Sequence, residues 1–392
     1  MTPTQQTQLS RRQVLETASW TMAAVAAQTA LPGFVFPGEQ EDEDLVPFLN
    51  MPRSTRKMLD WETLDSWITP PDQVFSVSHY GMPQFDAGKF RLEVGGLVDK
   101  PRTFSVKQLR ALPKAERLMT LECSGNGAGK GFLGAIYNGK WTGTPLAPLL
   151  KSCGIRKEAT EVVFFGIDQK VETIHKVKVP VPFGRSMSLA DALNANNLLA
   201  YDRAGKPIEK RNGAPLRLIV PGWYGIANVK WLTRIELRDR RFMGRFMGRD
   251  YVTLRGERHG GKVVFVETSV AKMNLKSIIA RVTRRPTKDG RVPVKAYGAV
   301  WGDGTPVRKV EVQVDGGRWQ TATLDKKPRS KYCWTFFSID LGLLTPGKHT
   351  VTSRAIDING RIQPTAQDDE IALKKTYWEA YQQWPREIEL KA

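Results

Sequence analysis

The feature that most limits the fold is a change in secondary-structure pattern near Asn274. Upstream, short strand-like runs mix irregularly with helix-like segments, whereas downstream strand-like runs follow one another without a helix between them. In the downstream part, Val310, Val312 and Val314 alternate with polar residues and lead into residues 315–317 (DGG), a hairpin signal. The pattern therefore predicts two domains of different class and excludes a single regularly alternating α/β unit.

The upstream part is predicted to be a mixed α+β domain covering residues 50–268. We expect helices over residues 105–112 and 188–194, with Ser105 and Ser188 as N-caps. Strands are expected over residues 90–94, 161–165 and 216–220. Because strands and helices do not alternate regularly, this domain is not expected to be a doubly wound sheet.

The downstream part is predicted to be a β-sandwich of roughly a hundred residues, over 269–385. Further strand candidates lie at 332–341 and 349–358. The acidic stretch 38–49, which follows Pro37, is interpreted as a linker outside the fold.

Residues 1–37 have the layout of a twin-arginine export signal. Arg11 and Arg12 precede an alanine-rich run over residues 20–30, which is too short and too polar for a comfortable membrane span. We therefore expect a periplasmic protein. Because twin-arginine systems move folded proteins, a cofactor would be inserted in the cytoplasm.

Charge and cysteine content restrict the partners and cofactors. A formal net charge of +19 favours anionic partners, but residues 234–249 form the only dense basic run, and the chain has no recognised nucleic-acid module. Nucleic-acid binding is therefore not expected. The three cysteines form neither a CxxC pair nor a CxxCH motif, so we expect no zinc ribbon, no thioredoxin-type redox pair and no haem in this chain.

One of these cysteines, Cys123, lies in residues 121–131 (LECSGNGAGKG), a segment with little side-chain bulk. Glycines leave room for a large ligand to approach the backbone, and a thiolate is the softest ligand atom of any protein side chain. The residues alone also allow a half-buried core cysteine followed by an ordinary turn.

Other segments become informative only in combination. His79 ends the strand-like run 75–79, Arg217 and Lys230 lie within 212–232, and Tyr251 follows residues 248–250 (GRD). Taken singly, each side chain fits an ordinary structural role.

Together, and in this order, the segments resemble the sulfite oxidase family of molybdenum enzymes, from about Asn50 to the C-terminus. The most specific pieces are residues 122–126 (ECSGN), 134–146 (GAIYNGKWTGTPL), 198–208 (LLAYDRAGKPI), 212–222 (NGAPLRLIVPG) with 228–232 (NVKWL), and 315–324 (DGGRWQTATL). The resemblance implies a molybdopterin-binding domain followed by an immunoglobulin-like dimerisation domain, and therefore a homodimer.

The resemblance also assigns roles to residues. Cys123 would supply a thiolate to molybdenum held by one molybdopterin, and the glycines after it would form a floor beneath the pterin. Tyr251 and Lys130 are the expected catalytic residues, Tyr251 as a donor and Lys130 as an anion contact. The other expected cofactor-binding residues are Phe75, Ser78, His79, Asp168, Asn212, Arg217, Asn228 and Lys230.

The activity implied is oxygen-atom transfer to a reduced sulfur substrate, sulfite or sulfane-like, with electrons passed to an external cytochrome. Where the family has substrate arginines, this chain has Val77, a short loop after Asn126, and residues 302–305 (GDGT). Without these arginines, the chain is not expected to bind free sulfite tightly. Sulfur attached to a carrier protein is therefore a candidate substrate. Reductive transfer from sulfoxides or nitrate, and a cofactor-free binding role, stay open as alternatives.

Overall fold

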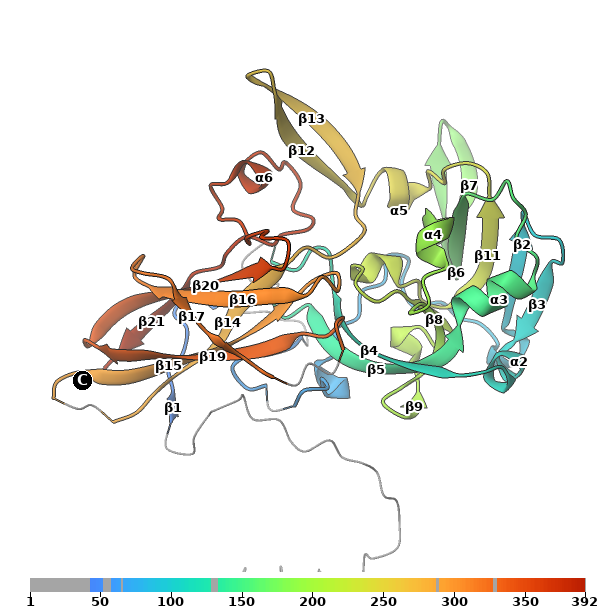
Figure 1. Cartoon of the computed structure of the whole chain (residues 1–392). Coiled ribbons are helices and arrows are strands. Elements are labelled where there is room, and N and C mark those ends of the chain that lie inside the picture. Colours follow the sequence, from blue (N-terminus) through green and yellow to red (C-terminus); the bar gives the residue numbers. More distant parts are fainter. Residues whose placement is uncertain are drawn as a thin grey trace, which may run out of the picture. The chain divides into compact units, whose positions relative to one another are not determined.

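A computed structural model describes residues 43–51, 58–64, 66–127, 133–286, 289–326 and 330–391 (Figure 1). The predicted export signal, including Arg11 and Arg12, and the predicted anion contact Lys130 lie outside the described residues. Within those ranges, no helix has the length and apolar character needed to cross a membrane.

The upstream part contains a sheet with strand order β3-β2-β11-β6-β7. Its β2–β11 pair is parallel and its other pairs are antiparallel, so its strands follow no regular βαβ pattern. The predicted strand at 161–165 is the first part of the longer β6, which forms a hairpin with β7. The strands are β2 (Arg91–Gly96), β3 (Arg102–Ser105), β6 (Glu161–Ile174), β7 (Val177–Ser188) and β11 (Leu232–Arg238).

A further sheet in this part has strand order β10-β8-β5-β4, with β9 added to β8. Its core includes Met119, Leu121 and Trp141, all buried. Cys123 follows the last residue of β4, and Arg217 begins β10. The strands are β4 (Ala115–Glu122), β5 (Ile136–Pro145), β8 (Leu198–Arg203), β9 (Lys206–Pro207) and β10 (Arg217–Ile219).

The predicted helices form, but they are short. Ser105 caps α2 (Val106–Ala111) through a capping box with Gln108, and Ser188 caps α4 (Leu189–Ala192). The other short helices are α3 (Leu146–Ser152), α5 (Arg245–Gly248), α6 (Asp369–Ala372) and the 3₁₀ turns η1 (Pro71–Gln73), η2 (Ala87–Lys89), η3 (Lys210–Asn212) and η4 (Gly225–Ala227). α2 ends one residue and α4 two residues before the predicted boundary, and strands outweigh helices among the described residues of this part.

The downstream part consists of facing sheets, β1-β14-β15-β19-β18 and β17-β16-β20-β21, which share one apolar core (Figure 1). As expected, residues 315–317 join β16 to the antiparallel β17. The strands are β14 (Lys276–Arg284), β15 (Val292–Trp301), β16 (Val307–Val314), β17 (Gln320–Thr321), β18 (Thr323–Leu324), β19 (Thr335–Leu344), β20 (Gly347–Asp357) and β21 (Arg386–Leu390). Before them, β12 (Val252–His259) and β13 (Lys262–Ser269) form a separate hairpin.

Two of the expected boundaries need correction. The predicted linker 38–49 contains β1 (Asp44–Leu45), which pairs with β14. The acidic Glu43 is not solvated, because its carboxylate accepts hydrogen bonds from Thr283 and Tyr297. The sandwich also extends past residue 385, because β21 pairs with β20 and buries Ile388 and Leu390.

A buried ion pair joins the upstream and downstream parts beside Cys123. Lys276, the first residue of β14, donates to Oε1 of Glu122 at 2.8 Å, and Trp301 Nε1 donates to Oε2 at 2.7 Å. Asn126 Nδ2 also donates to Oε1, at 2.9 Å. Side-chain exposure is 4% for Lys276 and 1% for Glu122, so each charge depends on these partners in place of water.

We predict that Lys276→Met lowers the free energy of unfolding by about 3–5 kcal/mol, because it leaves the Glu122 carboxylate charged and buried. Chemical denaturation followed by fluorescence measures the loss. Lys140→Met is the matched control, since Lys140 and Glu116 also lie 2.8 Å apart but are 40% and 55% exposed. That change should cost less than about 1 kcal/mol. Equal losses for both variants would contradict a special role for the buried pair.

Candidate active site

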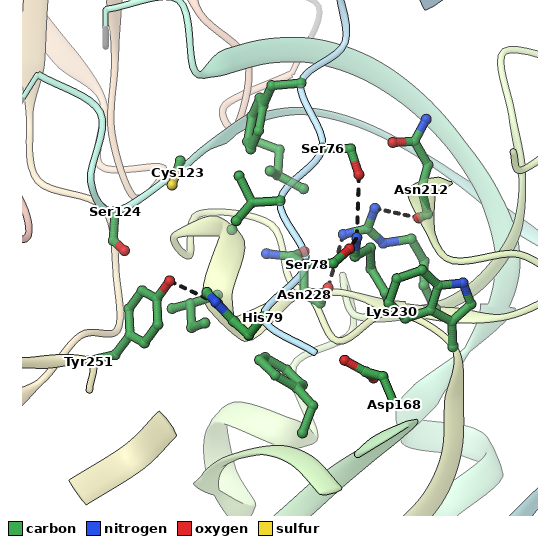
Figure 2. A pocket seen from close by; sticks show the side chains of 18 of the residues that line it. Ser76, Ser78, His79, Cys123, Ser124, Asp168, Asn212, Asn228, Lys230 and Tyr251 are labelled. Carbon is green, nitrogen blue, oxygen red and sulfur yellow. Dashed lines mark hydrogen bonds between the residues drawn. The ribbon is translucent and has the colours of Figure 1, made fainter. Parts of the chain in front are cut away.

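One cavity collects the predicted site residues that the structure describes. Cys123, Ser124 and Tyr251 lie at one end of the cavity, and Asp168, Asn212 and Lys230 lie at the other (Figure 2). The predicted residues that line it are Phe75, Ser78, His79, Cys123, Asp168, Asn212, Arg217, Asn228, Lys230 and Tyr251.

Buried polar atoms without a protein partner point to a ligand in this cavity. They are Ser124 Oγ, Asp168 Oδ1, Asn212 Nδ2 and Arg217 Nε. The four residues are at most 5% exposed, and all of them line the cavity. Because buried polar groups are normally hydrogen-bonded, convergent orphan donors and acceptors fit a polar ligand such as a pterin.

The end of the cavity opposite Cys123 is cationic. Lys230 Nζ donates to Ser78 Oγ at 2.8 Å, to Ser76 Oγ at 3.3 Å and to the Arg211 carbonyl at 3.0 Å (Figure 2). Burial, with Arg217 nearby, lowers the pKa of Lys230 to about 7, although Asp168 acts in the opposite direction. Burial raises the pKa of Asp168 itself to about 6. Both shifts show a desolvated pocket in which an anionic ligand would favour the charged form of Lys230.

Arg217 supports the Lys230 end of the cavity by holding the backbone around it. Its Nη1 donates to the Asn212 carbonyl at 2.8 Å, and its Nη2 donates to the Asn228 carbonyl at 2.9 Å. The guanidinium also lies over the ring of Trp141, with 5.0 Å between Cζ and the ring centroid. Arg217 therefore fixes the loop that carries Asn212 and keeps Nε available to a ligand.

Asn228 lines the cavity but has little donor or acceptor capacity left for a ligand. Its Oδ1 accepts from the Val220 amide at 2.8 Å, and its Nδ2 donates to the Tyr224 carbonyl at 3.1 Å. The amide therefore holds the 220–228 loop in shape. We therefore assign the Asn228 side chain a role in positioning this loop, in place of the predicted contact with a cofactor.

At the thiol end, Cys123 is partly exposed, and its backbone amide donates to the Ala135 carbonyl. The expectation that the following glycines form a pocket floor is wrong for Gly125 and Gly127, which do not line the cavity. A Cβ on Gly125 would lie 3.3 Å from the Tyr377 ring, and one on Gly127 would lie 3.3 Å from Lys276 Nζ. These glycines allow the Tyr377 ring and the Lys276 ammonium to approach the backbone closely.

Tyr251 and His79 form a hydrogen-bonded pair beside Cys123, with 2.9 Å between the phenolic oxygen and Nε2 (Figure 2). The imidazole packs against aromatic rings and stacks on Phe246 at 4.9 Å and on Phe183 at 5.7 Å. Burial of the ring lowers the pKa of His79 to about 4. Burial, with the Cys123 thiol nearby, raises the pKa of Tyr251. The pair is therefore neutral near pH 7 and can orient a substrate oxygen without adding charge.

Several residues of this site were not predicted from the sequence. Ser76 and Ser124 line the cavity, and Glu122 anchors the strand end that carries Cys123. Glu122 and Ser124 flank Cys123 directly. A charged residue next to Cys123, after the apolar residues 118–121, was the sequence signal that could have identified Glu122. Its partner Lys276 is distant in the chain, and no local pattern identifies it. In the described residues no cluster of His, Cys, Asp and Glu forms a metal site, so a metal here would need donors from outside the protein besides Cys123.

Comparisons with known proteins agree with this architecture. Residues 79–246 match the family model "Oxidoreductase molybdopterin binding domain", and residues 267–379 match "Mo-co oxidoreductase dimerisation domain". The chain is 30% identical to mitochondrial sulfite oxidase of Rattus norvegicus over 76% of this chain and 58% of that protein. It is 29% identical to sulfite oxidase of Arabidopsis thaliana over 77% of this chain and 83% of that protein. It thus spans little more than half the length of the rat relative.

Among solved structures, the sulfane dehydrogenase SoxCD from Paracoccus pantotrophus is similar, with a TM-score of 0.71 and 25% identity over 95% of this chain and 97% of that chain. Fold, cavity and matched domains define a molybdopterin-binding oxidoreductase with a dimerisation domain. The chain belongs to the sulfite oxidase family.

We predict that His79 stays neutral down to about pH 5. Its folded pKa of about 4 is below the ordinary 6.5, so the unfolded chain takes up the proton first, and stability falls as pH drops from 6.5 towards 4. An NMR titration of the ring protons, assigned with His79→Gln, measures the midpoint. His349 is the internal control, because its hydrogen bonds to Asp315 and the Thr345 carbonyl outweigh desolvation and raise its pKa. A His79 midpoint near 6.5 would contradict the enclosed, neutral pair.

Proposed function

We propose that the chain is an exported molybdenum enzyme that transfers an oxygen atom to a reduced sulfur substrate and passes electrons to an external cytochrome. The observation that carries the proposal is the single cavity with a thiol and a neutral phenol–imidazole pair at one end and orphan polar atoms with Lys230 at the other. When bound there, molybdopterin would supply a two-electron redox metal and an oxygen ligand. Cys123 is its proposed protein ligand.

The remaining residues have proposed roles that follow from their positions. Arg217 and Lys230 would hold the pterin phosphate, with Ser78 beside the ammonium group. Asp168 and Asn212 would bond polar edges of the pterin, and Phe75 would contact its apolar surface. Tyr251 would donate its one proton to a substrate oxygen, which requires the His79 tautomer whose Nε2–H donates to the phenolic oxygen.

Substrate chemistry follows from the charge distribution. Among the described residues that line the cavity, the cationic side chains are Arg217 and Lys230. Lys230 lies away from Cys123 (Figure 2), and Arg217 bonds to the Asn212 carbonyl at that same end. Val77 lines the cavity where an arginine fork would bind sulfite. We therefore propose weak recognition of free sulfite and a preference for sulfane-type sulfur, which a carrier protein could present. The structural likeness to a sulfane dehydrogenase supports this choice.

Location and assembly complete the proposal. Residues 1–37 are proposed to direct export to the periplasm. The dimerisation-domain match supports a homodimer, and the facing sheets of that domain are consistent with an immunoglobulin-like sandwich. A chain without haem, flavin or iron–sulfur motifs would need a separate electron acceptor.

The test is a substrate panel on protein purified from a host that makes molybdopterin. Sulfite and thiosulfate are tested with ferricyanide as oxidant, and dimethyl sulfoxide and nitrate with reduced methyl viologen. We expect oxidation of sulfur compounds, high KM for sulfite and about one molybdenum atom per chain. Reduction without oxidation would support the reductive alternative, and metal-free protein would support a binding scaffold.

Cys123→Ser should lower turnover at least a hundredfold while far-UV circular dichroism stays unchanged, because oxygen is a harder and less delocalising donor than sulfur. Cys153→Ser is the matched control, since Cys153 is buried and does not line the cavity. Activity at the wild-type level in Cys123→Ser would end the assignment.

We also expect Tyr251→Phe to lower kcat about tenfold with molybdenum content unchanged, because only one hydrogen bond is lost. Metal analysis and steady-state kinetics on the same preparation separate the two effects. A metal-depleted variant would contradict a catalytic role and indicate a structural one.

A further inference from the structure

A short turn late in the chain, residues 377–380, packs against the wall of the candidate active site. The ring of Trp378 stacks on Tyr251, with 4.3 Å between centroids and 25° between planes. The rings of Tyr377 and Trp378 also lie 3.3 and 3.5 Å from the position of a Cβ on Gly125. One turn therefore contacts both the loop that carries Cys123 and the tyrosine opposite it.

The backbone of this turn is held in an unusual conformation. Glu379 has a φ of 55°, in the left-handed region that a non-glycine residue rarely adopts. Its amide donates to the carbonyl of Ser124 at 2.7 Å. Strain of about 1–3 kcal/mol persists at such a position only when the surroundings over-determine it. The surroundings here include the residue next to Cys123.

Side chains from the Tyr251 side complete the attachment. Glu379, 6% exposed, accepts a hydrogen bond from Thr253 Oγ1 at 2.5 Å and one from Arg255 at 3.3 Å. Both partners lie on β12, which begins directly after Tyr251. Lys374 Nζ donates to the carbonyls of Trp378 and Glu379, at 2.7 and 3.0 Å. The turn is thereby tied to the element that positions the phenol.

We propose that the 377–380 turn is a clamp that fixes the Tyr251 hydroxyl relative to the Cys123 thiol, with Trp378 and Glu379 as positioning residues. Cys123 follows β4 and Tyr251 precedes β12, so neither element alone sets their separation. Glu379 joins them through one amide and one carboxylate. The catalytic consequence rests on the proposed function, whereas the mechanical link does not.

A small displacement of the Tyr251 hydroxyl is expected to lower the catalytic rate strongly. Misplacement of a catalytic group by about 1 Å can cost a hundredfold in rate. His79 holds the Tyr251 hydroxyl by one hydrogen bond, and Trp378 supports the ring by stacking. Loss of Trp378 would let the ring tilt around the remaining contact.

The mechanical link is tested without activity, on the full-length chain purified from a host that makes no molybdopterin. Iodoacetamide modifies Cys123, and mass spectrometry of its peptide gives the rate. We expect Glu379→Pro, which can neither adopt φ near 55° nor donate to Ser124, to raise this rate at least threefold. Trp378→Ala should raise it less. Cys153 and Cys333, which are buried, report any global loosening.

Tyr381→Phe is the matched control for this experiment. It keeps a ring in the same segment and removes only a hydrogen bond to Glu370. Its Cys123 alkylation rate should equal that of the wild type. An unchanged rate in Glu379→Pro, or an equal rise in the control, would overturn the clamp.

A double-mutant cycle on the holoenzyme, with sulfite and ferricyanide, tests the catalytic consequence. Trp378→Ala should lower kcat about tenfold, and Trp378→Phe should restore most of it because the stack remains. In a Tyr251→Phe background, Trp378→Ala should cost less than twofold. Equal losses in both backgrounds would overturn positioning through Tyr251. A wild-type enzyme that oxidises neither sulfite nor thiosulfate would count against the proposed function, while the alkylation result still decides the clamp.

Discussion

The buried ion pair between Glu122 and Lys276 is the interaction on which the candidate site depends. It occurs where β4 ends, one residue before Cys123, and Trp301 from β15 satisfies the second carboxylate oxygen. An unpaired charge at this depth would carry a desolvation cost of several kcal/mol, so the upstream and downstream parts must meet here in one register. Nearby, Thr120 accepts from the Trp334 amide at 2.7 Å and extends the same junction along β4.

This junction explains why a site built mostly from upstream residues needs the downstream part. The Cys123 loop is held from below by Lys276 and from the side by Glu379, both of which belong to the region matched by the dimerisation-domain model. A Cβ at Gly125 would crowd the Tyr377 ring, and one at Gly127 would crowd the Lys276 ammonium. Restricting the thiol in this way would preorganise Cys123 for its proposed role as a ligand.

Part of the fold and of the candidate site was predictable from patterns between residues close together in the sequence. Ser105 and Ser188 signalled their helices because an N-cap acts within one turn, and the valines from Val310 to Val314 signalled β16 because strand alternation is also local. Cys123 and its neighbours were identifiable by residue type and by resemblance. The partner of Glu122 and the stack of Trp378 on Tyr251 were not, since each joins residues that only the tertiary fold brings together. For the same reason, Glu43 resembled a linker residue until β14 and β15 supplied its donors.

The cavity separates two kinds of chemistry by desolvation. At the Lys230 end, burial and Arg217 depress the pKa of the ammonium to about 7, so binding of an anion there would draw in a proton and strengthen its own site. At the Cys123 end, His79 and Tyr251 are held neutral, so neither side chain would add charge beside the proposed sulfur substrate. A carboxylate or ammonium at that end would add a permanent charge beside the substrate, and its protonation could change when the substrate binds. With a neutral pair, a substrate would be oriented by hydrogen bonding to the Tyr251 hydroxyl. His79 and the clamp together fix the direction in which that hydroxyl points.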